Sequence, residues 1–154
     1  MTINNMVCVI GGDHHNMLGI IRMLGEKKVT VKAIITSDSK KTFCDKSKYL
    51  KECFFINNEK DIISKIKEFP KGTILIPTGD DAAFILDKHY DKLENNYIVP
   101  SINKCSGYIH KYMNKFYQSE LLKKYNLKVA NSYILNIGDN ISKYKKYPLI
   151  LKPL

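Results

Sequence analysis

Short apolar runs alternate with helical patterns over the first hundred residues of the chain. The run from Met6 to Ile10 is uninterrupted and ends in two glycines, which is typical of a strand buried on both faces of a parallel sheet. A second, β-branched strand is predicted from Val29 to Ile35. Between the two strands, apolar residues recur at i, i+3, i+4 and i+7, so they predict a helix with one apolar face. These residues are Met17, Ile20, Ile21 and Leu24.

Short polar residues and a glycine mark the ends of this first helix. Asp13 or Asn16 is expected to cap its start, because such side chains accept a backbone N–H there. Gly25 is expected to help end it. Together, the strand, the helix and the second strand have the size of a βαβ unit.

The same pattern continues as far as Pro100. Three further strands are predicted at residues 53–56, 73–76 and 97–99, and two further helices at residues 62–69 and 80–94. Alternating strands and helices with short connections indicate an open parallel sheet with helices on both faces. The sequence therefore predicts an α/β, Rossmann-like fold.

The pattern changes after Pro100. A short helical stretch is expected near residues 102–110, followed by a helix whose apolar face runs from Met113 to Tyr125. Two strands are predicted at residues 131–135 and 149–151. We expect a Rossmann-like domain at residues 1–110 and the start of a second, incomplete domain at residues 111–154. The last predicted strand needs partners that the chain does not supply, so the chain is expected to be a fragment.

The formal charge of +10 raises the question of nucleic-acid binding, because clustered basic side chains release counterions from phosphates. The lysines are scattered over the chain and Arg22 is its one arginine, whereas nucleic-acid readers favour arginine. We attribute the surplus of Lys, Asn, Ile and Tyr to the composition of the source genome. No nucleic-acid partner is expected.

Four cysteines without paired spacing predict reduced thiols and a cytoplasmic protein. They are Cys8, Cys44, Cys53 and Cys105. No apolar run reaches the roughly 18 residues that a membrane span requires, and the N-terminus has no signal-peptide pattern. No membrane association is expected.

Polar turns follow three of the predicted strands. Ligands of open parallel sheets gather at the carboxyl ends of the strands, so we expect these turns to contact a substrate. The residues are Gly11, Gly12, Asp13, Ser37, Asp38, Asp80 and Asp81. The backbone amides of the first turn could hold an anion, but the turn lacks the G-x-G-x-x-G spacing of a dinucleotide site.

Two features of these turns have alternative interpretations. His14 and His15 suggest a metal, but adjacent side chains point in different directions and no further ligand follows at a suitable spacing. Solvated loop histidines are expected, and no metal site is predicted. Asp80 and Asp81 either bind a substrate amine or hydroxyl, or cap and stabilise the helix that they open. The sequence leaves both interpretations of these acids open.

Lys115 and Lys152 stand where a positive charge is locally unfavourable. Lys115 falls in the first turn of a predicted helix, where it opposes the helix dipole. Lys152 ends an otherwise apolar strand. Two such lysines suggest a shared anionic partner, such as a nucleotide phosphate.

The second half of the chain carries motifs of a known family. Asn114 and Lys115 open a helix, the segment 122–132 follows, and the segment 147–153 reads YPLILKP. This order resembles the N-terminal part of ATP-grasp ligases, especially the carbamoyl-phosphate-synthase-like and D-aspartate-ligase-like members. In that family Asp-Lys opens the helix, Gly-Ile-x-x-Pro follows, and Tyr-Pro-x-Ile-x-Lys-Pro supplies an ATP-contacting lysine. The departures from this pattern are Asn114 for the aspartate, and Asn126, Leu127 and Ala130 for Gly, Ile and Pro.

The resemblance implies an ATP-dependent carboxylate–amine ligase that works through an acyl phosphate. It implies that Lys152 contacts the ATP phosphates, that Lys115 lies at the nucleotide end of the cleft, and that the strand-end turns form the substrate side. ATP and Mg²⁺ are then cofactors of the full-length enzyme, and a small-molecule carboxylate and an amine are its substrates. The family's adenine pocket and acidic Mg²⁺ ligands lie beyond the equivalent of Leu154. The fragment alone is therefore expected to be inactive and to bind no cofactor tightly.

Other functions remain open from the sequence. The main alternative is a stand-alone Rossmann-like nucleotide-binding module. A purely structural or interaction domain would instead expose an apolar surface for a protein partner. An incomplete second domain leaves strand edges unfilled, so a homodimer is one arrangement that the prediction allows.

Overall fold

The computed structural model describes residues 4–37, 42–144 and 148–151 of the chain. The chain divides into two compact units, Met1–His110 and Lys111–Leu154, each with its own contacts. The assignment of the second unit to an ATP-grasp domain remains a prediction.

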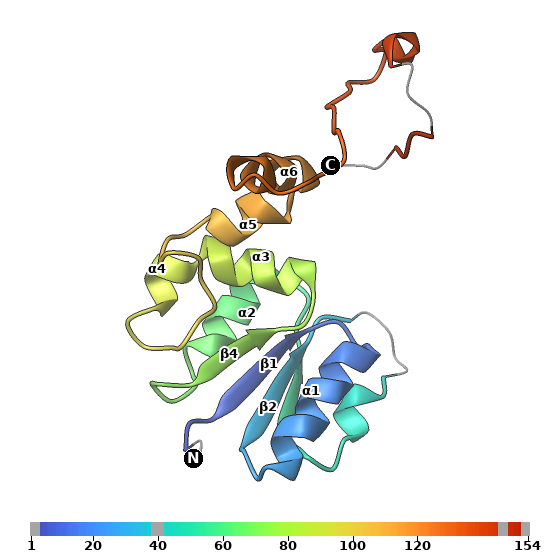
Figure 1. Ribbon diagram of the computed structural model, residues 1–154. Coiled ribbons are helices and arrows are strands. Elements are labelled where there is room, and N and C mark those ends of the chain that lie inside the picture. Colours follow the sequence, from blue (N-terminus) through green and yellow to red (C-terminus); the bar gives the residue numbers. More distant parts are fainter. Residues whose placement is uncertain (1–3, 38–41, 145–147, 152–154) are drawn as a thin grey trace. The chain divides into compact units, whose positions relative to one another are not determined.

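A four-stranded, all-parallel sheet forms the centre of the first unit (Figure 1). Its strands are β1 (Val7–Gly11), β2 (Val31–Ile35), β3 (Leu50–Phe55) and β4 (Ile74–Pro77). The strand order is β3-β2-β1-β4, so the chain leaves β1 toward one side and later crosses to the other. This sheet and its flanking helices confirm the predicted α/β, Rossmann-like fold.

Helices cover both faces of the sheet (Figure 1). On one face lie α1 (His15–Glu26) and the 3-10 turn η1 (Cys44–Lys46), and on the other lie α2 (Glu59–Ile66), α3 (Asp80–Lys88) and α4 (Tyr90–Leu93). The side chains of β1 alternate between these two cores. Val7 and Val9 pack on the α1 side, whereas Cys8 and Ile10 pack against α2 and α3. Burial on both faces explains why this strand is continuously apolar in the sequence.

The edge strand β3 begins at Leu50, earlier than the strand predicted at residues 53–56. Lys51 and Glu52 interrupt the apolar pattern there, and both side chains are exposed. An edge strand pairs on one side only and tolerates charged residues, so its first half resembles a loop in the sequence.

Two elements after β4 are shorter than predicted. The helix expected at residues 80–94 is interrupted at His89, where the hydroxyl of Ser106 donates to the carbonyl oxygen of Asp87 at 2.9 Å. The strand expected at residues 97–99 is reduced to a single bridge between Ile98 and Ile74. Pro100 follows closely and lacks the N–H that a longer ladder would need.

The sequence suggested that Gly25 helps to end α1, but in the structure Gly25 lies within the last turn of this helix. The helix ends at Glu26 with Lys27 as its C-cap, and Lys28 takes the left-handed conformation with φ of 60°. A β-carbon on Gly25 would overlap the Cβ and Cγ atoms of Tyr49 and lie 2.6 Å from its Cδ1 atom. Glycine therefore lets α1 approach the residue that precedes β3.

A buried carboxylate connects α3 with the start of α5 (Tyr108–Met113). Asp87 is 0 % exposed. Its two oxygens accept the backbone N–H groups of Ile109 at 3.2 Å and His110 at 2.9 Å. The rings of Phe84 and His110 lie beside this contact, with centroids 4.6 Å apart. Asp87 thus satisfies donors at the start of α5 that have no partner within that helix.

The second unit contains α6 (Lys115–Lys124) and the 3-10 turn η2 (Ile141–Lys143). The strands predicted at residues 131–135 and 149–151 are wrong, because the structure forms no strand in the described part of this unit. Ile134, Ile150 and Leu151 are 47 %, 80 % and 74 % exposed. An isolated strand is unstable without a neighbour that pairs with its backbone groups, and these segments have none among the described residues.

Lysines occur throughout the chain, but net charge is distributed unevenly between the two units because acidic residues are scarce in the second. Residues 111–154 hold nine lysines against two acidic residues, Glu120 and Asp139. Most of the chain's net positive charge therefore belongs to the second unit.

Candidate functional site

The carboxyl ends of β1 and β4 meet at the point where the strand order reverses. The N–H of Thr78, just after β4, donates to the carbonyl of Ile10 at 2.9 Å, and its hydroxyl donates to the same oxygen at 3.3 Å. Gly11 has φ of 154°, and a β-carbon on it would collide with the Thr78 hydroxyl. The turns that follow β1 and β4 are therefore in direct contact. Open parallel sheets bind ligands at this switch point.

His14 lies between these two turns. It is the N-cap of α1, and its Nδ1 atom accepts the backbone N–H of Met17 at 3.4 Å. A β-carbon on Gly12 would lie 3.3 Å from His14 Cδ2, and one on Gly79 would lie 3.8 Å from His14 Nε2. The expected caps, Asp13 and Asn16, do not fill this position, and His14 is half-buried and not a fully solvated loop residue.

The Asp13 carboxylate is directed at the segment before η1. Its two oxygens accept the N–H of Phe43 at 3.0 Å and that of Cys44 at 2.9 Å. The Cys44 thiol donates to the carbonyl of His14 at 3.4 Å, so this segment is fixed against the first turn. Burial, and then the neighbouring Asp13 carboxylate, raise the pKa of Cys44 to about 12. This thiol is protonated at neutral pH and is no nucleophile.

Asp80 and Asp81 form the first turn of α3, and both side chains are exposed. The N-cap residue is Gly79, which supplies no side-chain cap. Among the described residues, no hydrogen bond or ion pair engages either carboxylate. Of the two interpretations, side-chain capping is therefore not observed, while favourable charge at a helix start and ligand binding both remain.

The other predicted site residues lie apart from these turns or outside the described residues. Ser37 is half-buried just after β2, whereas Asp38 and Lys152 lie outside the described residues. Lys115 is the first residue of α6 and is exposed. Asn114 caps this helix, since its Oδ1 accepts the N–H of Phe116 at 2.9 Å. Asparagine thus provides the helix start for which the resembling family has aspartate.

A groove of about 520 Å³ runs beside the switch point, between α1 and the end of β4. Its lining residues are His15, Asn16, Gly19, Ile20, Met23, Pro77 and Thr78. The groove continues the polar turns into a partly apolar surface. A ligand with a polar head and a short carbon skeleton matches this combination of surfaces.

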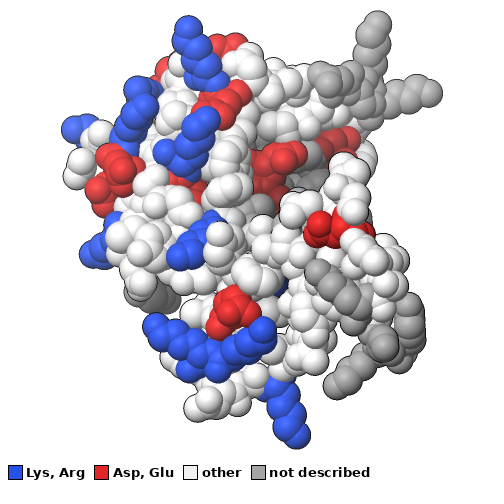
Figure 2. All heavy atoms as spheres, turned by 90° about the horizontal axis from the view of Figure 1, so that it is seen from above, with Lys and Arg blue, Asp and Glu red and all other residues white. Residues whose placement is uncertain are grey.

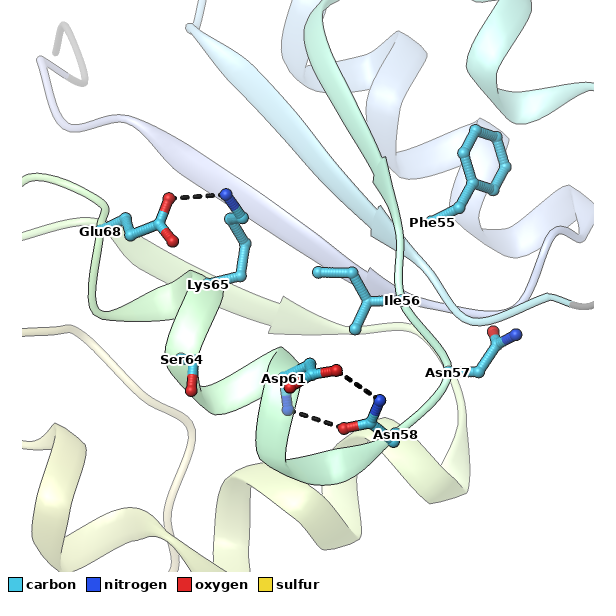
Figure 3. Close-up of a pocket in the computed structure, with 8 residues that line it drawn as sticks. All are labelled: Phe55, Ile56, Asn57, Asn58, Asp61, Ser64, Lys65 and Glu68. Carbon is cyan, nitrogen blue, oxygen red and sulfur yellow. Dashed lines mark hydrogen bonds and ion pairs between the residues drawn. The ribbon is translucent and has the colours of Figure 1, made fainter.

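A second hollow, of about 540 Å³, lies between the end of β3 and α2. Figure 3 shows that Asn58 interacts with Asp61, and Lys65 with Glu68, along its wall. Asn58 caps α2 by accepting the N–H of Asp61 at 2.8 Å and donating to its carboxylate at 2.6 Å, and Lys65 pairs with Glu68 at 2.6 Å. This hollow lies at the edge strand and away from the switch point, so we do not assign it as the site.

Metal and polyanion sites have weak support. The described residues contain no group of three His, Cys, Asp or Glu side chains that could hold a metal ion. On the face drawn in Figure 2, basic side chains stand in several separate groups with acidic side chains between them.

None of the helices in the described parts of the chain is long and apolar enough to cross a membrane.

Comparisons with known proteins add no family assignment: no protein-family model matches the chain, and no curated protein matches it.

Sequence reasoning located the two turns that meet at the switch point but missed how they are joined. Thr78 hydrogen-bonds to the end of β1 and the His14 ring lies near Gly79, but neither residue was singled out for this role. Histidine is not among the common N-cap residues, so its capping role carries no sequence signal. The contact of Thr78 depends on β1 and β4 being neighbours, which only the strand order reveals.

Proposed function

We propose that the chain is the N-terminal part of an ATP-dependent carboxylate–amine ligase that works through an acyl-phosphate intermediate. The observation that carries the proposal is the meeting of two polar turns at the switch point of a parallel sheet. The motif order that resembles ATP-grasp ligases adds the class of reaction. In this proposal the first unit forms the substrate side of the site.

The two helices that begin at the switch point, α1 and α3, differ in the charge of their first turns, which suits a carboxylate and an amine. The first turn of α1 contains no acidic residue, so its N-terminal amides and helix dipole favour an anion. The first turn of α3 contains Asp80 and Asp81, whose exposed carboxylates favour an ammonium or hydroxyl group. We assign the carboxylate substrate to the Gly11–Gly12 turn and the amine to the acidic turn.

Lysines of the second unit would serve the nucleotide. ATP would supply the phosphoryl group that activates the carboxylate, and Mg²⁺ would neutralise the charge of the phosphates. Lys115 and Lys152 would stabilise the negative charge that develops on the transferred group. The excess of lysine over acidic residues in residues 111–154 supports binding of phosphates in this region.

A stand-alone nucleotide-binding module is the alternative. It is favoured by the glycine turn that opens a 12-residue helix without an acid in its first turn. This module would bind a nucleotide to the 154-residue chain with no need for further sequence. The ligase proposal requires residues beyond Leu154 for the adenine and the metal.

The deciding experiment compares the 154-residue chain with the chain extended by the coding sequence downstream of Leu154. We expect carboxylate- and amine-dependent release of ADP from the extended protein and none from the 154-residue chain. Lys152→Ala should abolish the release, and Lys71→Ala, which changes an exposed lysine of the first unit, should leave it unchanged. Tight nucleotide binding by the short chain would favour the alternative, whereas ligase turnover by the short chain would contradict the need for residues beyond Leu154.

A further inference from the structure

His14 is held at the switch point by two features of the fold. As the N-cap of α1, it uses Nδ1 to accept the Met17 N–H at 3.4 Å. Two glycines, one from each turn, leave space for its ring: β-carbons on Gly12 and Gly79 would each lie 3.8 Å from Nε2. The ring is thus fixed in orientation and lies where the two turns meet.

The cap decides which ring nitrogen carries the proton. A nitrogen that accepts a hydrogen bond must present a lone pair, so Nδ1 is unprotonated. In the neutral imidazole the proton is then on Nε2. A proton on Nδ1 would face the Met17 N–H and break the cap. His14 therefore presents Nε2–H as a donor of defined position.

Nothing in the described part of the chain accepts this proton. The nearest carboxylate in sequence, Asp13, is occupied by the N–H groups of Phe43 and Cys44. The first turn of α1 has no acid, and the neighbouring aromatic ring is that of His15, with ring centroids 6.2 Å apart. This donor is therefore left for a ligand that reaches the two turns.

We propose that His14 is a specificity-determining residue, whose Nε2–H donates to an anionic oxygen of the ligand bound at the switch point. The inference rests on the proposed function, since it takes the switch point to be a ligand site. The anionic oxygen belongs to a carboxylate or a phosphate. Because the α1 cap keeps the proton on Nε2, His14 recognises a ligand atom that accepts a hydrogen bond and not one that donates it.

The first test needs no ligand. Long-range ¹H–¹⁵N correlation spectra of the imidazole rings distinguish the two neutral tautomers. In alkaline solution, His14 should show a proton on Nε2 and none on Nδ1. The opposite tautomer would overturn the proposal.

The second test separates recognition from capping. His14→Asn keeps an oxygen that can cap α1 but removes the Nε2–H donor, and His14→Ala removes both. His110→Asn is the matched control, because His110 is exposed and belongs neither to the groove nor to the two turns. Acetate and inorganic phosphate are the probes, and the amide resonances of Gly12 and Gly79 report binding.

We expect the wild-type protein and His110→Asn to bind at least one anion alike. His14→Asn should keep the thermal stability of the wild type and bind about tenfold more weakly or worse, as for loss of a hydrogen bond to a charged acceptor. Acetate binding identifies a carboxylate subsite, and phosphate binding identifies a phosphate subsite. Wild-type affinity in His14→Asn means that the residue is structural only, and overturns the proposal. If neither anion binds the wild type, the proposal is also wrong, whereas ADP release by the extended chain still tests the ligase function separately.

Discussion

The two glycines of α1 should respond in opposite directions to the same substitution. A β-carbon on Gly19 would have no atom within 4 Å, whereas one on Gly25 would overlap Tyr49. Replacing a helical glycine with alanine typically gains about 0.5–1 kcal/mol. Gly19→Ala should therefore raise the free energy of unfolding by about that amount.

Gly25→Ala gains the same backbone term but forces atoms apart. The overlap involves the Cβ atom of Tyr49, which the backbone fixes and no side-chain rotation can move. Either α1 or the segment before β3 must then shift, and overpacking of this kind costs about 1–3 kcal/mol. The net effect should be a loss of roughly 1–2 kcal/mol in the free energy of unfolding.

Urea titrations followed by far-ultraviolet circular dichroism measure both effects. A double-mutant cycle with Tyr49→Gly isolates the contact, since this change removes the fixed Cβ atom. In that background Gly25→Ala should become neutral or stabilising. The reasoning fails if Gly25→Ala is as stable as the wild type, or if its cost persists when Tyr49 is glycine.

Two further predictions concern titratable side chains. Glu59 accepts Lys88 Nζ at 2.9 Å, and this contact, more than any other, lowers the pKa of its carboxyl below the usual value of 4.5. A carboxyl whose pKa is lower in the folded protein stabilises the fold at pH values above its unfolded-state pKa, and this stabilisation is lost as the pH falls through its folded-state pKa. Glu59→Gln should therefore flatten the fall in melting temperature with acidification between about pH 6 and pH 3. An unchanged slope would contradict this. Cys44, with its pKa raised to about 12, should resist iodoacetamide at pH values near 8 while the exposed Cys105 reacts, as peptide mass spectrometry can follow. Equal labelling rates for the two thiols in the folded protein would show that Cys44 is not enclosed as described.

The parts of the fold that burial controls could be predicted from the sequence. The run that became β1 faces apolar cores on both sides, so its pattern had one interpretation. The elements at the edges of the sheet could not be predicted from burial in this way. The charged start of β3 has the pattern of a loop, and the segment around Ile98 has the composition of a strand but forms one bridge. Edge and terminal segments depend on neighbours that local patterns do not specify.

The sequence predicted where the candidate site lies, but it did not predict the hydrogen bonds that join its parts. Glycine turns after apolar strands indicate where strands end, so both turns were found. The partners of Asp13 lie 30 and 31 residues further along the chain, and no local pattern links them to it. The same limit applies to Thr78, whose contact with the end of β1 requires two strands far apart in sequence to be neighbours.

The Asp87 contact determines where this chain can be cut. Its carboxylate is buried and accepts the backbone N–H groups of residues 109 and 110. A shortened protein that stops before residue 109 would leave a buried negative charge without those donors, at a cost of several kcal/mol. A shortened protein that continues to Met113 keeps both donors and the whole of α5. Dissection of the two units for crystallisation or spectroscopy should therefore place the break after α5, although the compact first unit itself ends at His110.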